Sequence, residues 1–224
     1  PWTALEEEFA RRVANVSASK LPIPQTDVSL FGSRPRSIEL HALAQLTEDF
    51  GTGWHLENHS PMGLFALAFW DWIYAPVDGA FLNAFQSGPT DLFWPDFFGV
   101  RQFHCEDPLE STDSLPERFL RTHRDKNGIS NRLINWSELT QDRLERIVEV
   151  IDAPALGQVL SIVRAGLEEA RAGFPDLTVL YEPGRYEFVE VKGPGDRVQS
   201  NQQLWMRRLL ERDIPTRVMR FSLV

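Results

Sequence analysis

Cysteine, long apolar runs and positive charge are all scarce in this sequence. Because Cys105 is the single cysteine, no disulfide can form within the chain, which fits a reducing compartment. No apolar run approaches the roughly 20 residues that a membrane-spanning helix needs, and there is no signal-peptide pattern, so we expect no membrane partner. Lysine and arginine number 23 against 32 acidic residues, and the resulting net charge of −9 disfavours DNA contact over the whole surface.

Basic and aromatic residues are nevertheless concentrated in places. Residues 118–132 carry four arginines and one lysine against one acid, and residues 196–224 carry six arginines against three acids. Seven tryptophans and fifteen phenylalanines belong to a chain that is 42% hydrophobic, which is enough for a sizeable core. Basic patches on an acidic body therefore stay compatible with nucleic-acid binding.

The apolar pattern predicts helices first and a mixed α/β region afterwards. Segment 61–76, PMGLFALAFWDWIYAP, is apolar on nearly all sides and predicts a buried helix. After residue 175 the period changes to that of two strands, 176–182 and 186–192, joined by a turn. The other predicted elements are helices at 3–15, 36–51, 137–151 (capped by Ser137), 154–172 and 200–212, strands at 27–32 and 215–224, and irregular structure at 77–116.

The predicted hairpin carries two acids and an amine. Asp176 stands at the start of its first strand, and Glu190 and Lys192 lie on its second strand. Side chains two residues apart share one face of a strand, so Val189 and Val191 point the other way, into the core. The hairpin therefore offers two carboxylates and an ammonium group on one face.

Such a set fits a site for a hard divalent cation. Two close carboxylates repel one another unless a cation lies between them, and Mg²⁺ or Mn²⁺ prefers oxygen ligands. A neighbouring lysine can orient a water molecule or stabilise a developing anion. These parts together indicate metal-assisted hydrolysis of a phosphodiester, although an acid and a base two apart on a strand are more often a solvated pair.

The full motif resembles a nuclease signature. The order PD, turn, E-x-K, helix matches the PD-(D/E)XK nucleases, and GFPDL with FVEVKGPGDRVQSNQQLW resembles the VRR-NUC domain. The resemblance implies a restriction-endonuclease-like α/β core, a mixed central sheet flanked by helices with helical insertions. It also implies that Gln202, on the following helix, supports the site and that the Val191 carbonyl is a metal ligand.

The upstream segments SIELHALAQLTEDFGTGWHLEN, MGLFALAFWDWIY and GAFLNAFQSGPTDLFWPDFF resemble the Fanconi-associated nuclease family, here a bacterial member's C-terminal part. The resemblance implies that Glu57 is a further ligand, with Asp176 and Glu190, of one or two Mg²⁺ or Mn²⁺ ions, and that Lys192 positions the attacking water. It implies a 5′-flap endonuclease and 5′-to-3′ exonuclease of interstrand crosslink repair. Its partner would be branched DNA, in the bacterial cytoplasm and nucleoid or in a eukaryotic nucleus.

The expected domain organisation follows from the same resemblance, which covers roughly residues 36–224. Because the chain begins with Pro1 rather than methionine, we expect a fragment of a longer protein. Residues 1–35 would be a linker or the tail of a preceding helical domain, and residues 36–224 a VRR-NUC nuclease domain. The missing N-terminal part would then supply much of the DNA-binding surface.

The sequence departs from the family pattern at one position that is expected to bind phosphate. Members of the family often carry a lysine just before the helix glutamine, where this sequence has Asn201. Arg197, Arg207 and Arg208 are alternative DNA-binding residues, and a solvated helix face explains them equally well.

Other candidates have simpler explanations. His55 and His59 flank Glu57 without forming a zinc-peptidase HExxH motif, so we interpret both as incidental, with a DNA contact by one of them as the alternative. Asp71 on the buried helix is expected to be a hydrogen-bonded structural acid. Most aromatic residues of 81–103 are expected in the core rather than stacked on bases, with Trp94 the best candidate for exposure. A non-catalytic DNA-binding or scaffold module, and a restriction-type or RNA nuclease, are the alternative functions.

Overall fold

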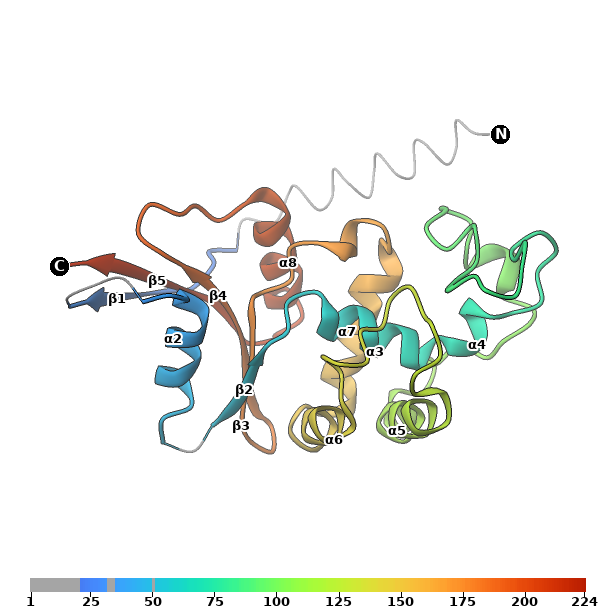
Figure 1. The fold of residues 1–224 in the computed structure, drawn as a ribbon, viewed down its shortest axis with the longest axis horizontal. Coiled ribbons are helices and arrows are strands. Elements are labelled where there is room, and N and C mark those ends of the chain that lie inside the picture. Colours follow the sequence, from blue (N-terminus) through green and yellow to red (C-terminus); the bar gives the residue numbers. More distant parts are fainter. Residues whose placement is uncertain (1–20, 32–34, 50) are drawn as a thin grey trace.

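The computed structural model describes residues 21–31, 35–49 and 51–224, so the helix expected at 3–15 lies outside the described part. Five strands form one mixed sheet (Figure 1). They are β1 (Gln25–Leu30), β2 (Thr52–His55), β3 (Leu177–Glu182), β4 (Arg185–Lys192) and β5 (Thr216–Leu223). The order is β1-β5-β4-β3-β2; β5 is parallel to β1 and β4, and β3 is antiparallel to β4 and β2. The predicted mixed sheet is confirmed.

Helices cover both faces of this sheet. They are α2 (Ile38–Leu46), α3 (His59–Ala68), α4 (Trp70–Ile73), α5 (Leu115–Lys126), α6 (Gln141–Val150), α7 (Ala153–Ala165) and α8 (Ser200–Leu210). Short 3₁₀ turns occur at Gly99–Arg101, Thr112–Ser114 and Glu169–Arg171. Figure 1 shows α2 on one side of the sheet and α8 on the other.

The central strand β4 is buried on both sides. Val189 and Val191 pack into a smaller hydrophobic cluster with Ile38 and Ala42 of α2. Phe188 instead belongs to the larger cluster, which also contains side chains of α3, α6, α7 and α8. The predicted direction of the two valines is thus confirmed, but the opposite face of β4 is covered by protein as well.

Several predicted boundaries move for local reasons. The helix expected over 36–51 begins after Ser37, whose Oγ accepts the Leu40 amide (3.1 Å), but it ends at Leu46 because Thr52–His55 pair with β3 as β2. The helix expected from Ser137 begins after Thr140, whose side chain caps it at Arg143. β1 precedes the boundary that we expect at residue 36 and yet pairs with β5 along its whole length; the boundary stays a prediction.

Two expectations about burial are wrong. The apolar helix is interrupted at Phe69, and Asp71 beyond the interruption is 75% exposed, 3.9 Å from Arg118, rather than a buried structural acid. In segment 81–103, where most aromatic residues are expected in the core, only Phe97 is fully buried, while Phe93 and Phe98 are partly buried against the core. Phe85 and Phe103 are more exposed than Trp94, whose exposure is confirmed. Among the described residues, no helix is both long and apolar enough to cross a bilayer.

Candidate active site

The β3–β4 hairpin brings Asp176 against β4. Asp176 directly precedes β3, and Leu177 pairs with Val189 across the hairpin. The Asp176 carboxylate, which precedes this pair, accepts a 2.8 Å hydrogen bond from the backbone amide of Val191. One oxygen of Asp176 is therefore held against the backbone of β4 at Val191, the residue between Glu190 and Lys192.

Glu190 and Lys192 are not a solvated pair. Glu190 is fully buried, Lys192 is only 8% exposed, and Lys192 Nζ donates to Glu190 Oε1. The second carboxylate oxygen, Glu190 Oε2, is buried without a hydrogen-bond partner among the described residues. A buried carboxylate oxygen of this kind is costly unless something positive binds it.

Electrostatics in the hairpin also favour a cation. Burial, and next the neighbouring Asp176 carboxylate, raise the pKa of Glu190 to about 7 although Lys192 opposes the shift. Burial likewise raises the pKa of Asp176 above its usual range, against the opposing effects of the Val191 amide and Lys192. A divalent cation would relieve both costs, so these residues fit an Mg²⁺ or Mn²⁺ site.

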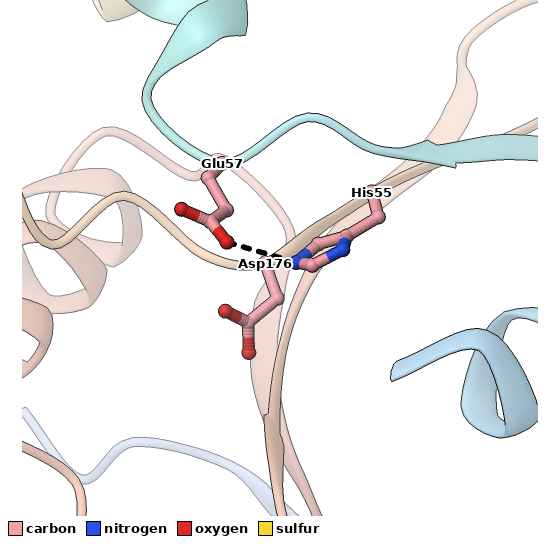
Figure 2. A group of neighbouring side chains, drawn as sticks. All are labelled: His55, Glu57 and Asp176. Atoms are coloured by element: carbon pink, nitrogen blue, oxygen red, sulfur yellow. Dashed lines mark ion pairs between the residues drawn. The ribbon is translucent and has the colours of Figure 1, made fainter. Parts of the chain in front are cut away.

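Glu57 reaches the hairpin through backbone hydrogen bonds. The amides of Leu56 and Glu57 both donate to the Asp176 carbonyl, at 3.2 Å each. Asn58 Oδ1 accepts the amide of Phe174 at 3.0 Å. Glu57 adopts φ +46°, a left-handed conformation that is unusual for a residue other than glycine. Such conformations cluster at functional sites, and this one turns the Glu57 side chain toward Asp176 (Figure 2).

His55 joins the same group, as Figure 2 shows. One donor atom each of His55, Glu57 and Asp176 lie within 4.8 Å of one another, and His55 Nε2 lies 3.0 Å from Glu57 Oε1. The interpretation of His55 as incidental missed this contact; the only sequence signal was its position two residues before Glu57. His59 is exposed as the first residue of α3 and lies outside the group.

Gln202 has a structural partner of its own. Its Oε1 accepts the Gln199 amide at 2.9 Å, and the Gln199 side chain accepts from the Gln202 backbone, which completes a capping box for α8. The helix start is close to the chain leading into β3, since a Cβ at Gly173 would lie 2.7 Å from the Asn201 carbonyl carbon. The side-chain oxygen of Gln202 is thus already hydrogen-bonded, so only the side-chain nitrogen of Gln202 can donate to a ligand.

The three candidate arginines differ in exposure. Arg197 is exposed in the loop between β4 and α8, whereas Arg207 and Arg208 are half-buried on α8. Burial lowers the pKa of Arg208, and Arg207 Nε is buried without a partner among the described residues. Arg197 is therefore the most accessible of the three, and the α8 pair is not an ordinary solvated face.

Comparisons with known proteins agree with this geometry. The family model of the VRR-NUC domain matches residues 111–222. The chain is 34% identical over 200 residues to the Fanconi-associated nuclease 1 homolog of Pseudomonas aeruginosa, across 88% of this chain and 36% of that protein. It is 32% identical over 182 residues to human Fanconi-associated nuclease 1, across 77% of this chain and 18% of the human protein. The chain thus spans well under half the length of these curated relatives.

A solved structure has the same fold. The crystal structure of paFAN1 bound to 2-nucleotide 5′-flap DNA with a gap superposes with a TM-score of 0.85 at 32% identity, over 92% of this chain and 39% of that chain. A second paFAN1 complex, with a 1-nucleotide flap, gives a TM-score of 0.86. The restriction-endonuclease-like core that the sequence predicts is thereby confirmed.

Proposed function

The chain belongs to the VRR-NUC domain family, and from this premise we propose that it is a metal-dependent, structure-specific DNA nuclease. The observation that carries the proposal is the approach of both Glu57 and Glu190 to Asp176, with Lys192 against Glu190 and one Glu190 oxygen buried without a partner among the described residues. A fully buried acid without a complete set of partners is poor for stability, so its retention in the core is best explained by ligand binding.

The carboxylates of Glu57, Asp176 and Glu190, together with the Val191 carbonyl, would hold one or two Mg²⁺ or Mn²⁺ ions. Such ions supply Lewis-acid polarisation of a phosphoryl oxygen and charge stabilisation during phosphodiester hydrolysis. The protein fixes the Asp176 carboxylate through the Val191 amide and fixes Glu57 through the Asp176 carbonyl. These backbone contacts keep the acids in place before any ligand arrives.

Lys192 would orient the attacking water. Its ammonium group lies against Glu190 Oε1, and only 8% of the residue is exposed. The side-chain amide of Gln202 would donate a hydrogen bond to a phosphate oxygen or to a water molecule. Arg197 would contact the DNA backbone, and Arg207 and Arg208 would be further DNA-binding residues. Backbone contacts of this kind position DNA without reading its sequence.

The proposed substrate is branched DNA with a 5′ flap, cut by endonuclease action and then by 5′-to-3′ exonuclease action. The support is that paFAN1, which shares this fold, was crystallised with 5′-flap DNA. We also propose a part in interstrand crosslink repair, which the relatives' name, Fanconi-associated nuclease, supports. The protein would then act on chromosomal DNA, in a bacterial nucleoid or a eukaryotic nucleus.

A cleavage panel tests the proposal. The chain, alone and joined to the remaining part of a longer protein if there is one, is assayed on 5′-flap, 3′-flap, nicked, duplex and single-stranded DNA and on RNA. We expect Mn²⁺- or Mg²⁺-dependent cutting near the 5′ flap, none in EDTA, and a loss of at least ~100-fold in Asp176→Asn. Normal cutting in EDTA, or by Asp176→Asn, contradicts the metal site. Tight flap binding without cutting by any form favours a scaffold module instead.

A further inference from the structure

His55 lies beside the proposed metal site because of strand pairing. It is the last residue of β2, and its partner in the antiparallel ladder is Leu177, the residue directly after Asp176. Glu57 follows two residues later and turns back through its left-handed backbone conformation. The imidazole therefore faces the two acids from a regular strand, which is a rigid support for a ligand.

The distances suit shared coordination of one ion. Ligand atoms bind Mg²⁺-sized ions at about 2.0–2.2 Å, so neighbouring ligands in an octahedral shell lie about 3 Å apart and opposite ligands about 4 Å apart. His55 Nε2 is 3.0 Å from Glu57 Oε1, and the donor atoms of His55, Glu57 and Asp176 all lie within 4.8 Å of one another. The geometry needs only small shifts to place all three around one centre.

An independent observation points to a cation at this place. The fully buried Glu190 interacts with Asp176, and its Oε2 has no hydrogen-bond partner among the described residues. This oxygen comes from β4, on the opposite side of β3 from His55. Ligands thus converge on Asp176 from both of its neighbouring strands.

A nitrogen ligand changes which ion the site prefers. Carboxylate and carbonyl oxygens alone suit Mg²⁺ and Mn²⁺ alike, whereas an imidazole favours ions of the transition series over Mg²⁺. On the basis of the proposed function, we propose that His55 Nε2 is a direct ligand of the metal ion held by Glu57 and Asp176, and that it makes the site prefer Mn²⁺ over Mg²⁺.

The competing explanation is that His55 only orients Glu57 through a hydrogen bond. The variant His55→Gln separates the two roles, because the glutamine amide can still donate to Glu57 but its nitrogen has no lone pair to offer a metal ion. His59→Gln is the matched control, since His59 is also an exposed histidine near Glu57 but lies outside the group. Thermal melts of the metal-free variants check that both retain the fold.

The test is pulsed electron paramagnetic resonance of the chain loaded with Mn²⁺ alone, together with binding titrations of Mn²⁺ and Mg²⁺. We expect nitrogen-14 coupling to Mn²⁺ in the wild type and in His59→Gln but not in His55→Gln. His55→Gln should weaken Mn²⁺ binding by at least ~10-fold while Mg²⁺ binding changes by less than ~3-fold.

The outcomes separate this inference from the proposed function. If Mn²⁺ binds in an Asp176-dependent way without nitrogen coupling, or if His55→Gln retains the coupling or the Mn²⁺ affinity, His55 is not a ligand and the carboxylate site stands. If the wild-type chain binds no Mn²⁺ and cuts DNA in EDTA, both the inference and the proposed metal site are wrong.

Discussion

The side chain of Asn58 accepts a 3.0 Å hydrogen bond from the backbone amide of Phe174, 116 positions further along the chain. With the two amides that donate to the Asp176 carbonyl, it fastens the Glu57 loop to the segment entering β3. The distance between the acids therefore depends on backbone contacts as well as on the acids themselves.

Replacing Asn58 by alanine should weaken both stability and the site. Phe174 is buried, so its amide would lose its partner away from water, and we expect the free energy of unfolding to fall by about 1–2 kcal/mol. The rate of cleavage should fall by more than the loss of stability explains, because the hydrogen bond from Phe174 to Asn58 no longer holds the Glu57 loop in place. Urea unfolding and single-turnover cleavage measure the two effects. Asn58→Asp keeps an oxygen acceptor and should stay close to wild-type stability; equal losses in both variants contradict this account.

Glu190 should give the metal-free chain a distinctive pH dependence. Its pKa is about 7 in the folded state against 4.5 ordinarily, so between these values the folded state holds a proton that the unfolded state has released. Stability must then fall as pH rises through this window, by about 2–3 kcal/mol. Glu190→Gln stays neutral and should lack this slope. The check is urea unfolding in EDTA between pH ~5 and ~8.

The informative quantity in that experiment is the difference in unfolding free energy between wild type and Glu190→Gln, which removes the contributions of titrating groups that do not interact with Glu190. A difference that is flat across the window would mean that Glu190 ionises like an exposed acid. Saturating Mn²⁺ should raise the wild-type stability at the alkaline end, because it binds only the folded state.

Gly173 should tolerate alanine poorly. Its φ is +99°, and a Cβ there would lie 2.7 Å from the Asn201 carbonyl carbon and 2.8 Å from its oxygen. Gly184, in the β3–β4 turn, has a similar φ of +78° but open space around it. Gly184→Ala should therefore cost only the conformational strain of about 1–2 kcal/mol, and Gly173→Ala at least ~1 kcal/mol more. Thermal and urea unfolding compare the two; equal costs would show that α8 has room to move.

The capping role of Gln202 can be separated from its proposed contact with DNA. Gln202→Glu keeps an oxygen for the Gln199 amide, so helix capping and stability should be retained, whereas Gln202→Ala should lose about 0.5–1 kcal/mol. If the Gln202 amide also donates to DNA phosphate, Gln202→Glu should raise the KM for flap DNA by about 10-fold or more, because it replaces a donor with a negative charge. Unchanged cleavage kinetics in Gln202→Glu would limit this residue to capping.

The last third of the fold was predictable from the sequence because its signals are local. Strand alternation, the Pro183-Gly184 turn and the apolar stripe of α8 each lie within a dozen residues, and all appear in the structure. Strand β2 was missed because Thr52–His55 is four residues long, contains a glycine and exists only by pairing with β3. Asp71 was misjudged because the helix break at Phe69 has no proline or glycine to mark it.

In the candidate site, only the residues that belong to a recognisable sequence motif could be predicted. Asp176, Glu190 and Lys192 follow from strand geometry, and Glu57 follows from the family resemblance. The proximity of His55 to the acids depends on the left-handed backbone at Glu57 and on the register of β2, and neither can be read from residue type. The capping role of Gln202 needed the observed helix start at Ser200.

The contacts between the Glu57 loop and the chain entering β3 also determine when, during protein synthesis, the candidate site can form. Its two halves lie more than a hundred residues apart, and closing so long a loop is entropically unfavourable until the helices between them have packed. A nascent chain that contains the Glu57 loop but not yet β4 lacks Glu190 and therefore has an incomplete cluster of acids. The acids of the candidate site therefore come together only after the chain has been synthesised through β4.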